Sequence, residues 1–278
     1  MAIATSDFSF DIGRVASRTF AVIGRNFVSF FVLAIVALLP YILMSALMTQ
    51  AVLPGVRTGV LSPEYGLLIL GGWIVSYGFN FVLQGALTHG TIMDLNGGRA
   101  SLGDLLMTGL RFLFPLFAIA LLMVLVFIVS YVVLVLPGIF LRLLWLIGIS
   151  FVVYIVPVVM LLVMWSVVVP AKVVENTGIF ASFGRSARLT KGHRWAILGL
   201  IVIYAVGAAI IYSILLAIFG FTFLAGDLGM TSILSFAAST LVKAAFTVVS
   251  STGVACIYYE LRSGKEGVGS EQLASVFE

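Results

Sequence analysis

Long uninterrupted apolar stretches dominate the chain, and short segments with most of the charged and turn-forming residues separate them. A helix needs roughly 20 apolar residues to cross a bilayer core about 30 Å thick. The stretches are rich in Leu, Val and Ile and lack the alternation of barrel strands, so they predict helices. Six spans are predicted, near Phe27–Thr49, Gly66–Thr88, Phe112–Leu136, Leu144–Val169, Trp195–Phe219 and Thr231–Ile257.

The composition agrees with this pattern. Hydrophobic residues make up 62% of the chain and charged residues 9%, whereas a soluble domain carries about 25% charged residues. The sequence therefore predicts an all-α polytopic integral membrane protein, with one membrane domain over residues 1–278. A single cysteine, Cys256, excludes an intrachain disulfide.

The placement of the basic residues predicts the orientation of the helices. Of the 15 Lys and Arg, only Arg57 and Arg142 fall on one side of the membrane, Lys243 lies within the sixth span, and the rest fall on the other side. Because cytoplasmic segments carry the excess of Lys and Arg, both termini are expected in the cytoplasm. The expected location is the bacterial inner membrane.

A short motif recurs where the first, third and fifth spans begin. Gly24-Arg25-Asn26-Phe27, Gly109-Leu110-Arg111-Phe112 and Gly192-His193-Arg194-Trp195 each combine a glycine, a basic or amide residue and an aromatic residue after an amphipathic stretch. The motif predicts three units, each an interfacial helix, a glycine bend and a two-span hairpin; chance similarity is the alternative. The units lie near residues 7–93, 101–170 and 177–259, and a cytoplasmic tail over 260–278 follows.

Basic residues cluster around these motifs. In amphipathic helices at a membrane surface they contact anionic lipid phosphates; the alternative is that the charges only set the topology. The neighbouring aromatic residues fit a lipid surface better than a nucleic-acid surface, so no nucleic-acid partner is expected. The predicted lipid-interface residues are Arg14, Arg18, Arg25, Arg111, Arg185, Arg188, Lys191, Arg194 and Trp195.

Several motifs together resemble the membrane domain of glycerophosphoryl diester phosphodiesterases and its stand-alone bacterial relatives of unknown function. They are Phe10–Phe27, Leu136–Ile139, Pro170–Glu175, Gly184–Trp195 and the tail from Tyr258 through Gly267. In the two-part enzymes of that family a soluble barrel carries the chemistry, and the membrane domain holds it at the bilayer. This sequence has no counterpart of the barrel, so the resemblance implies a fold and a location and argues against hydrolase activity.

Two polar stripes cross the predicted spans. Asn80 and Gln84 share one face of the second span, and Ser239, Lys243 and Thr247 share one face of the sixth. An ionised group in the middle of a membrane is costly and usually functional; the alternative is that the polar residues only join helices. We expect these five residues to line a groove that accepts an anionic headgroup.

The sequence contains no motif for catalysis or cofactor binding. His89 and His193 lack carboxylate companions at metal-ligand spacing, and neither a Gly-x-Ser-x-Gly elbow nor a Walker loop occurs. We therefore expect no enzyme activity, no metal and no cofactor. The favoured function is a protein that binds or organises anionic phospholipid. The alternatives are a transporter or channel for a small anionic or amphipathic solute, or a membrane scaffold that holds a protein partner through its tail.

Overall fold

The computed structural model describes residues 10–58, 63–141, 144–224 and 230–267. Within these residues the chain forms helices and no strands, which confirms the all-α prediction. The helices are α1 (Ile12–Arg25), α2 (Phe27–Thr58), α3 (Pro63–Leu95), α4 (Leu102–Phe140), α5 (Leu144–Met164), α6 (Val168–Glu175), α7 (Ile179–Thr190), α8 (Arg194–Leu224) and α9 (Met230–Glu266).

Each predicted span falls mainly within one long helix. Five segments of the described residues are long and apolar enough to cross a membrane, namely Phe27–Ser45, Leu102–Leu134, Gly148–Glu175, Arg194–Ile218 and Ala237–Glu266. The chain is therefore a multi-pass membrane protein. The remaining predicted span lies in α3, where polar residues such as Asn80 and Gln84 lower the hydropathy; its place in the membrane stays a prediction.

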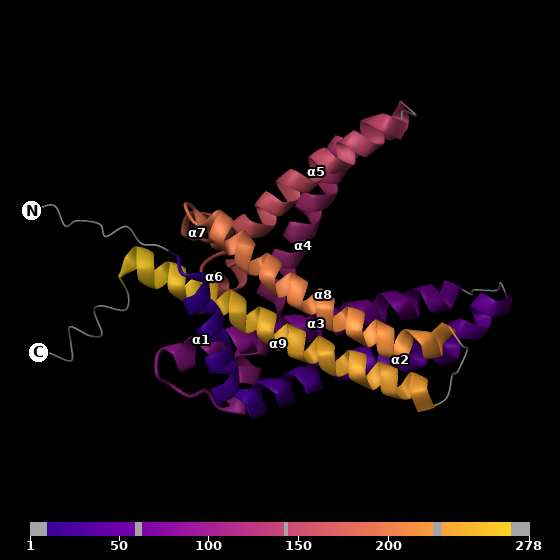
Figure 1. Ribbon diagram of the computed structural model, residues 1–278, viewed down its shortest axis with the longest axis horizontal. Helices are drawn as coiled ribbons and strands as arrows, with labels where there is room; N and C mark the ends of the chain where they lie inside the picture. The colour runs from indigo at the N-terminus through magenta and orange to yellow at the C-terminus, as the bar shows by residue number, and fades with distance from the viewer. Residues whose placement is uncertain (1–9, 59–62, 142–143, 225–229, 268–278) are drawn as a thin grey trace, which may run out of the picture.

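The long helices form three hairpins, α2–α3, α4–α5 and α8–α9, and α4–α5 diverges from the other two (Figure 1). Helix α9 is central, because it packs against α1, α2, α3 and α8. The beginning of α1 and the end of α9 lie at the same end of the molecule (Figure 1). Helix α9 continues to Glu266, so the first residues of the predicted tail extend this helix, and residues 268–278 lie outside the described part.

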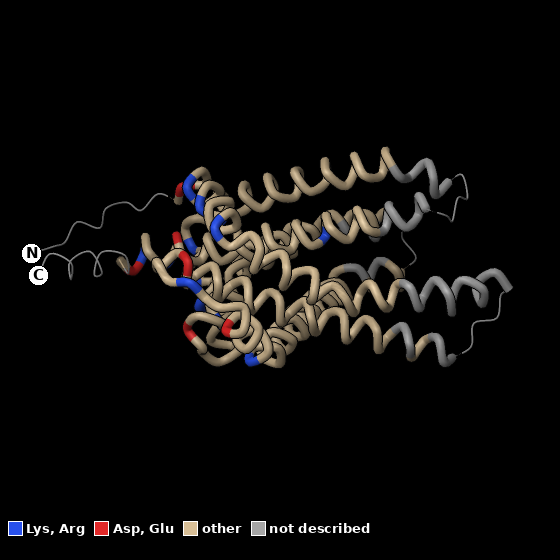
Figure 2. Tube along the Cα trace, turned by 90° about the horizontal axis from the view of Figure 1, so that it is seen from below, with Lys and Arg blue, Asp and Glu red and all other residues tan. Residues whose placement is uncertain are grey.

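Charged residues gather at the end of the molecule where α1, α6 and α7 lie, as Figure 2 shows for Lys, Arg, Asp and Glu together. We call this the charged end. This arrangement agrees with the one-sided distribution of basic residues along the sequence. Arg142 lies outside the described residues, as does the side chain of Arg57, so the two exceptions to that distribution are not placed.

The three predicted units differ in their first helices. Helices α1 and α7 are separate short helices before α2 and α8, as expected. In the second unit, however, α4 runs without a break from Leu102 to Phe140, so the prediction of a separate interfacial helix before this span is wrong. A capping box starts this helix, because Ser101 and Asp104 hydrogen-bond to each other through side chain and backbone.

Gly109 brings α3 and α4 together. A Cβ atom on Gly109 would lie 2.3 Å from the carbonyl oxygen of Val82, and one on Gly85 would lie 3.3 Å from the Cα atom of Gly109. Glycines at a helix crossing let two backbones approach closely in a membrane. The glycine of the second motif therefore lies at a close crossing of two helices.

Candidate functional site

The buried carboxylate of Glu260 connects α9, the last helix of the described residues, to α1, the first. The Glu260 side chain is 2% exposed and accepts hydrogen bonds from Arg14 at 3.0 Å and from Arg18 at 2.5 Å. Asp11 caps the start of α1 by accepting from the Arg14 backbone N–H at 3.0 Å. Helix α1 therefore lies on α9 with two of its predicted lipid-contacting arginines directed at a carboxylate of the protein.

A second ion pair holds the start of the first hairpin. Arg25 donates to both carboxylate oxygens of Asp94, and the Asn26 side chain donates to the same carboxylate at 2.9 Å. Partial burial raises the pKa of the Asp94 carboxyl, but the hydrogen bonds from Arg25 and Asn26 outweigh it and hold that pKa below its usual value. The end of α3 is thereby tied to the turn between α1 and α2.

This ion pair makes a pH-dependent contribution to stability. A depressed folded pKa means that the contribution is complete above the unfolded Asp pKa, about 3.9, and is lost as the pH falls through the folded value. We expect Asp94→Asn to lose about 1.5 kcal/mol at neutral pH. Thermal unfolding in detergent should show the gap between wild type and variant closing as the pH is lowered toward about 3. If the difference in stability between wild type and Asp94→Asn were the same at all pH values, the pH-dependent role of the Arg25–Asp94 ion pair would be contradicted.

A third set of contacts fixes α7 near the charged end. Arg185 contacts Glu175 at 2.8 Å and also pairs with Glu266, and the Tyr258 hydroxyl donates to Glu175 at 2.8 Å. These contacts join α6, α7 and α9. Arg185 is therefore another predicted lipid-interface residue whose charge is balanced within the protein.

The other predicted interface residues form a basic surface with an aromatic anchor. Arg111, Arg188 and Lys191 are exposed, and no carboxylate of the described residues pairs with them. Trp195 is 85% exposed at the start of α8. Arg194 lies beside it, half-buried, and its Nε has no hydrogen-bond partner in the described part of the chain. Arg111, Arg188, Lys191 and Arg194 therefore carry positive charge that no carboxylate of the described residues balances.

Lys243 lies deep within α9 against an aromatic ring. Its Nζ is 3.5 Å from the centroid of the Tyr41 ring of α2. At about 1.5 Å per residue it stands roughly 25 Å along the axis of α9 from Glu260. No carboxylate of the described residues pairs with Lys243, and Tyr41 was not predicted as its partner.

Among the described residues, hydrogen bonds join members of the predicted polar groove within each helix. The Gln84 amide donates to Asn80 at 2.9 Å, so these side chains satisfy each other along α3. The Thr247 hydroxyl donates to the Lys243 carbonyl at 2.8 Å, and Ser239 lies one turn away on α9. No hydrogen bond between described residues links Lys243 to Asn80 or Gln84. These contacts form two polar pairs, Asn80 with Gln84 on α3 and Lys243 with Tyr41 between α9 and α2.

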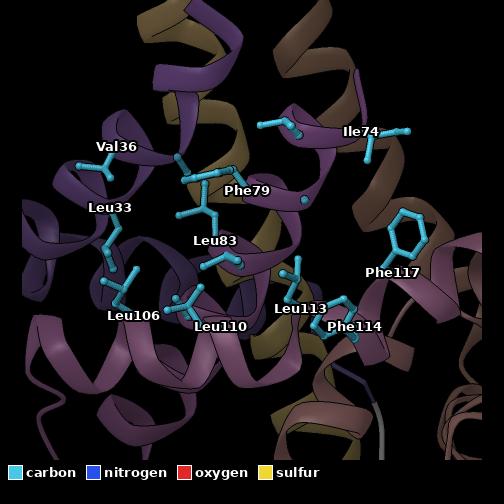
Figure 3. Close-up of a pocket in the computed structure, with 15 residues that line it drawn as sticks. Leu33, Val36, Ile74, Phe79, Leu83, Leu106, Leu110, Leu113, Phe114 and Phe117 are labelled. Atoms are coloured by element: carbon cyan, nitrogen blue, oxygen red, sulfur yellow. The ribbon is translucent and has the colours of Figure 1, made fainter. Parts of the chain in front are cut away.

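An apolar groove of about 440 Å³ lies between α2, α3 and α4. Figure 3 shows Phe79 and Leu83 of α3 between the side chains from α2 and those from α4. Such a hollow depends on how three helices pack, and sequence periodicity gave no signal for it.

Known proteins give no assignment for this site. No family profile, curated protein or solved structure matches the chain. In the part of the chain that the structure describes, no group of three His, Cys, Asp or Glu side chains is placed to hold a metal ion. The features that bear on function are therefore the contact of Lys243 with Tyr41, the basic surface and the apolar groove.

Proposed function

We propose that this chain is a non-enzymatic bacterial inner-membrane protein that binds anionic phospholipid, with both termini in the cytoplasm. The observation that carries the proposal is Lys243, an intramembrane cation over the Tyr41 ring with no carboxylate partner in the described residues. The likeness to the membrane domain of phosphodiesterases agrees with a membrane-bound, non-catalytic role.

The chemistry of Lys243 favours an anionic ligand. An ammonium group in the bilayer core is costly unless it is paired. The face of a tyrosine ring stabilises a cation by about 0.5–2 kcal/mol, which is less than a full counter-charge provides. A phosphate that reaches Lys243 supplies that charge, and the hydroxyls of Ser239 and Thr247 lie on the same face of α9.

The basic surface supports binding on the cytoplasmic side. Anionic lipids attract a basic residue near the membrane surface by about 1 kcal/mol. Arg111, Arg188 and Lys191 are free to make such contacts, and the exposed ring of Trp195 suits the headgroup level. Arg14, Arg18, Arg25 and Arg185 contribute less, because carboxylates already hold them.

Lys243→Met tests the proposal. In native mass spectrometry of protein released gently from its membrane, we expect the variant to retain about tenfold less phosphatidylglycerol, which corresponds to about 1.4 kcal/mol. Lys243→Arg keeps the charge and serves as the matched control, with retention near that of wild type. Equal retention by all three proteins would assign Lys243 to helix packing.

The same preparations separate the other functions. Flux of a labelled anionic solute or phospholipid across protein-containing vesicles, lost in Lys243→Met, would favour a transporter. A protein that co-purifies at fixed stoichiometry in wild type and variant alike would favour a scaffold. Retained phospholipid without flux or partner supports the binding function.

A further inference from the structure

The groove between α2, α3 and α4 has a lining of apolar side chains. It holds about 440 Å³, within the range of roughly 300–1,000 Å³ that is typical of ligand pockets. Its lining includes three small residues, Ala37 of α2 and Gly78 and Ala86 of α3. Among the residues that the structure describes, no charged side chain lines it, so the occupant that fits is apolar.

Gly78 differs from other glycines on α3. A Cβ atom on Gly85 or Gly90 would lie within 3.3 Å of atoms of a neighbouring helix, so these glycines serve close packing. A Cβ atom on Gly78 would meet only Leu113, at 3.8 Å. Gly78 therefore does not bring helices together but leaves space that no side chain of the described residues fills.

The length and position of the groove identify its occupant. From Ile74 to Ala86 the lining of α3 extends roughly 18 Å along the helix axis, which is comparable to half of a bilayer core of about 30 Å. Leu106 lies one turn from the start of α4, so this half belongs to the leaflet at the charged end. Of the helices around it, α2 and α4 are long and apolar enough to span a membrane, and α3 is predicted to do so. The narrow apolar molecule available at that depth is a lipid tail.

We propose that this groove binds one acyl chain of a phospholipid from the leaflet at the charged end. The site is separate from the proposed headgroup contact, because neither Lys243 nor Tyr41 lines the groove. It fixes a lipid by its tail and selects for chain shape, whereas Lys243 selects for charge. The two proposals can therefore fail independently.

The test is photo-cross-linking with phosphatidylglycerol that carries a diazirine at the middle of one acyl chain, in phosphatidylcholine vesicles that contain the full chain. Labelled peptides from α2, α3 and α4 are expected in the wild type. Gly78→Leu fills the groove and should lower this labelling about tenfold, or about 1.4 kcal/mol in binding free energy. Gly71→Leu, at an exposed α3 position with nothing within 4 Å, is the matched control and should label like wild type.

Two further variants keep the outcomes distinct. Val36→Trp narrows the rim of the groove from a position that is 43% exposed, so it provides the same test if Gly78→Leu fails to fold. Lys243→Met should leave the groove labelling unchanged even where it reduces retention of anionic lipid. Equal labelling of Gly78→Leu and Gly71→Leu, or labels spread evenly over α5 and α8, would overturn the acyl-chain site.

Discussion

Replacing both Arg14 and Arg18 with glutamine should destabilise the protein by about 3–5 kcal/mol. The reason is the carboxylate that the double variant leaves behind. Glu260 is 2% exposed, and its charge is balanced by these two guanidinium groups. Without them a buried charge has neither an ionic partner nor water, and α1 loses its polar attachment to α9.

The loss is measurable as a lower midpoint in denaturant titration of the protein in detergent. Arg188→Gln removes an exposed arginine at the same end of the molecule and is the matched control, with an expected change within about 0.5 kcal/mol. A double variant as stable as Arg188→Gln would show that the native protein does not depend on these arginines to balance Glu260.

A third substitution separates the charge effect from lost packing. Adding Glu260→Gln to the double variant removes the uncompensated charge, and neutral amides of similar shape cost far less to bury. Most of the lost stability should therefore return. If the triple variant is no more stable than the double variant, the aliphatic parts of the arginines carry the contact.

These contacts change the role of the amphipathic first helix. Lipid phosphates were expected to hold Arg14, Arg18 and Arg25, but Glu260 and Asp94 hold them in the structure. The carboxylates lie 246, 242 and 69 residues away along the chain, and no local pattern connects them. A sequence shows which residues carry charge, whereas only the folded chain shows which charges are already balanced.

The long helices were predictable because their signal is local. Each stretch is apolar over enough residues to span a bilayer, whatever its neighbours are. The capping box of Ser101 and Asp104 is likewise contained within four residues, so its signal is local as well. Lys243 was also recognisable as unusual, since a lysine within an apolar stretch stands out from its surroundings.

The contacts between helices could not be predicted in the same way. Tyr41 contacts Lys243 because α2 and α9 pack side by side, and the groove exists because three helices leave a gap beside Gly78. The shared motif, a glycine followed by any residue, Arg or Asn and an aromatic residue, predicted a bend at Gly109. The structure breaks the chain between helices before α2 and before α8 but not at Gly109. A glycine, however, serves a bend and a close helix crossing equally well.

Gly109→Ala distinguishes these two uses of glycine, and we expect it to destabilise the protein by about 2 kcal/mol. The added Cβ atom would lie 2.3 Å from the Val82 carbonyl oxygen and 2.9 Å from the Val82 Cγ1 atom. Both contacts involve a neighbouring helix, so α3 and α4 must separate. The separation loses packing that outweighs the gain of about 1 kcal/mol from alanine in a helix.

Gly71→Ala provides the comparison on α3, because nothing lies within 4 Å of its added Cβ atom. It should be neutral or stabilising by up to about 1 kcal/mol in the same detergent titration. The difference in the free energy of unfolding between Gly109→Ala and Gly71→Ala then measures the cost of separating α3 from α4. If Gly109→Ala and Gly71→Ala changed the free energy of unfolding equally, α3 and α4 would not cross closely at Gly109. The bend that the motif predicts would then be the better explanation of this glycine.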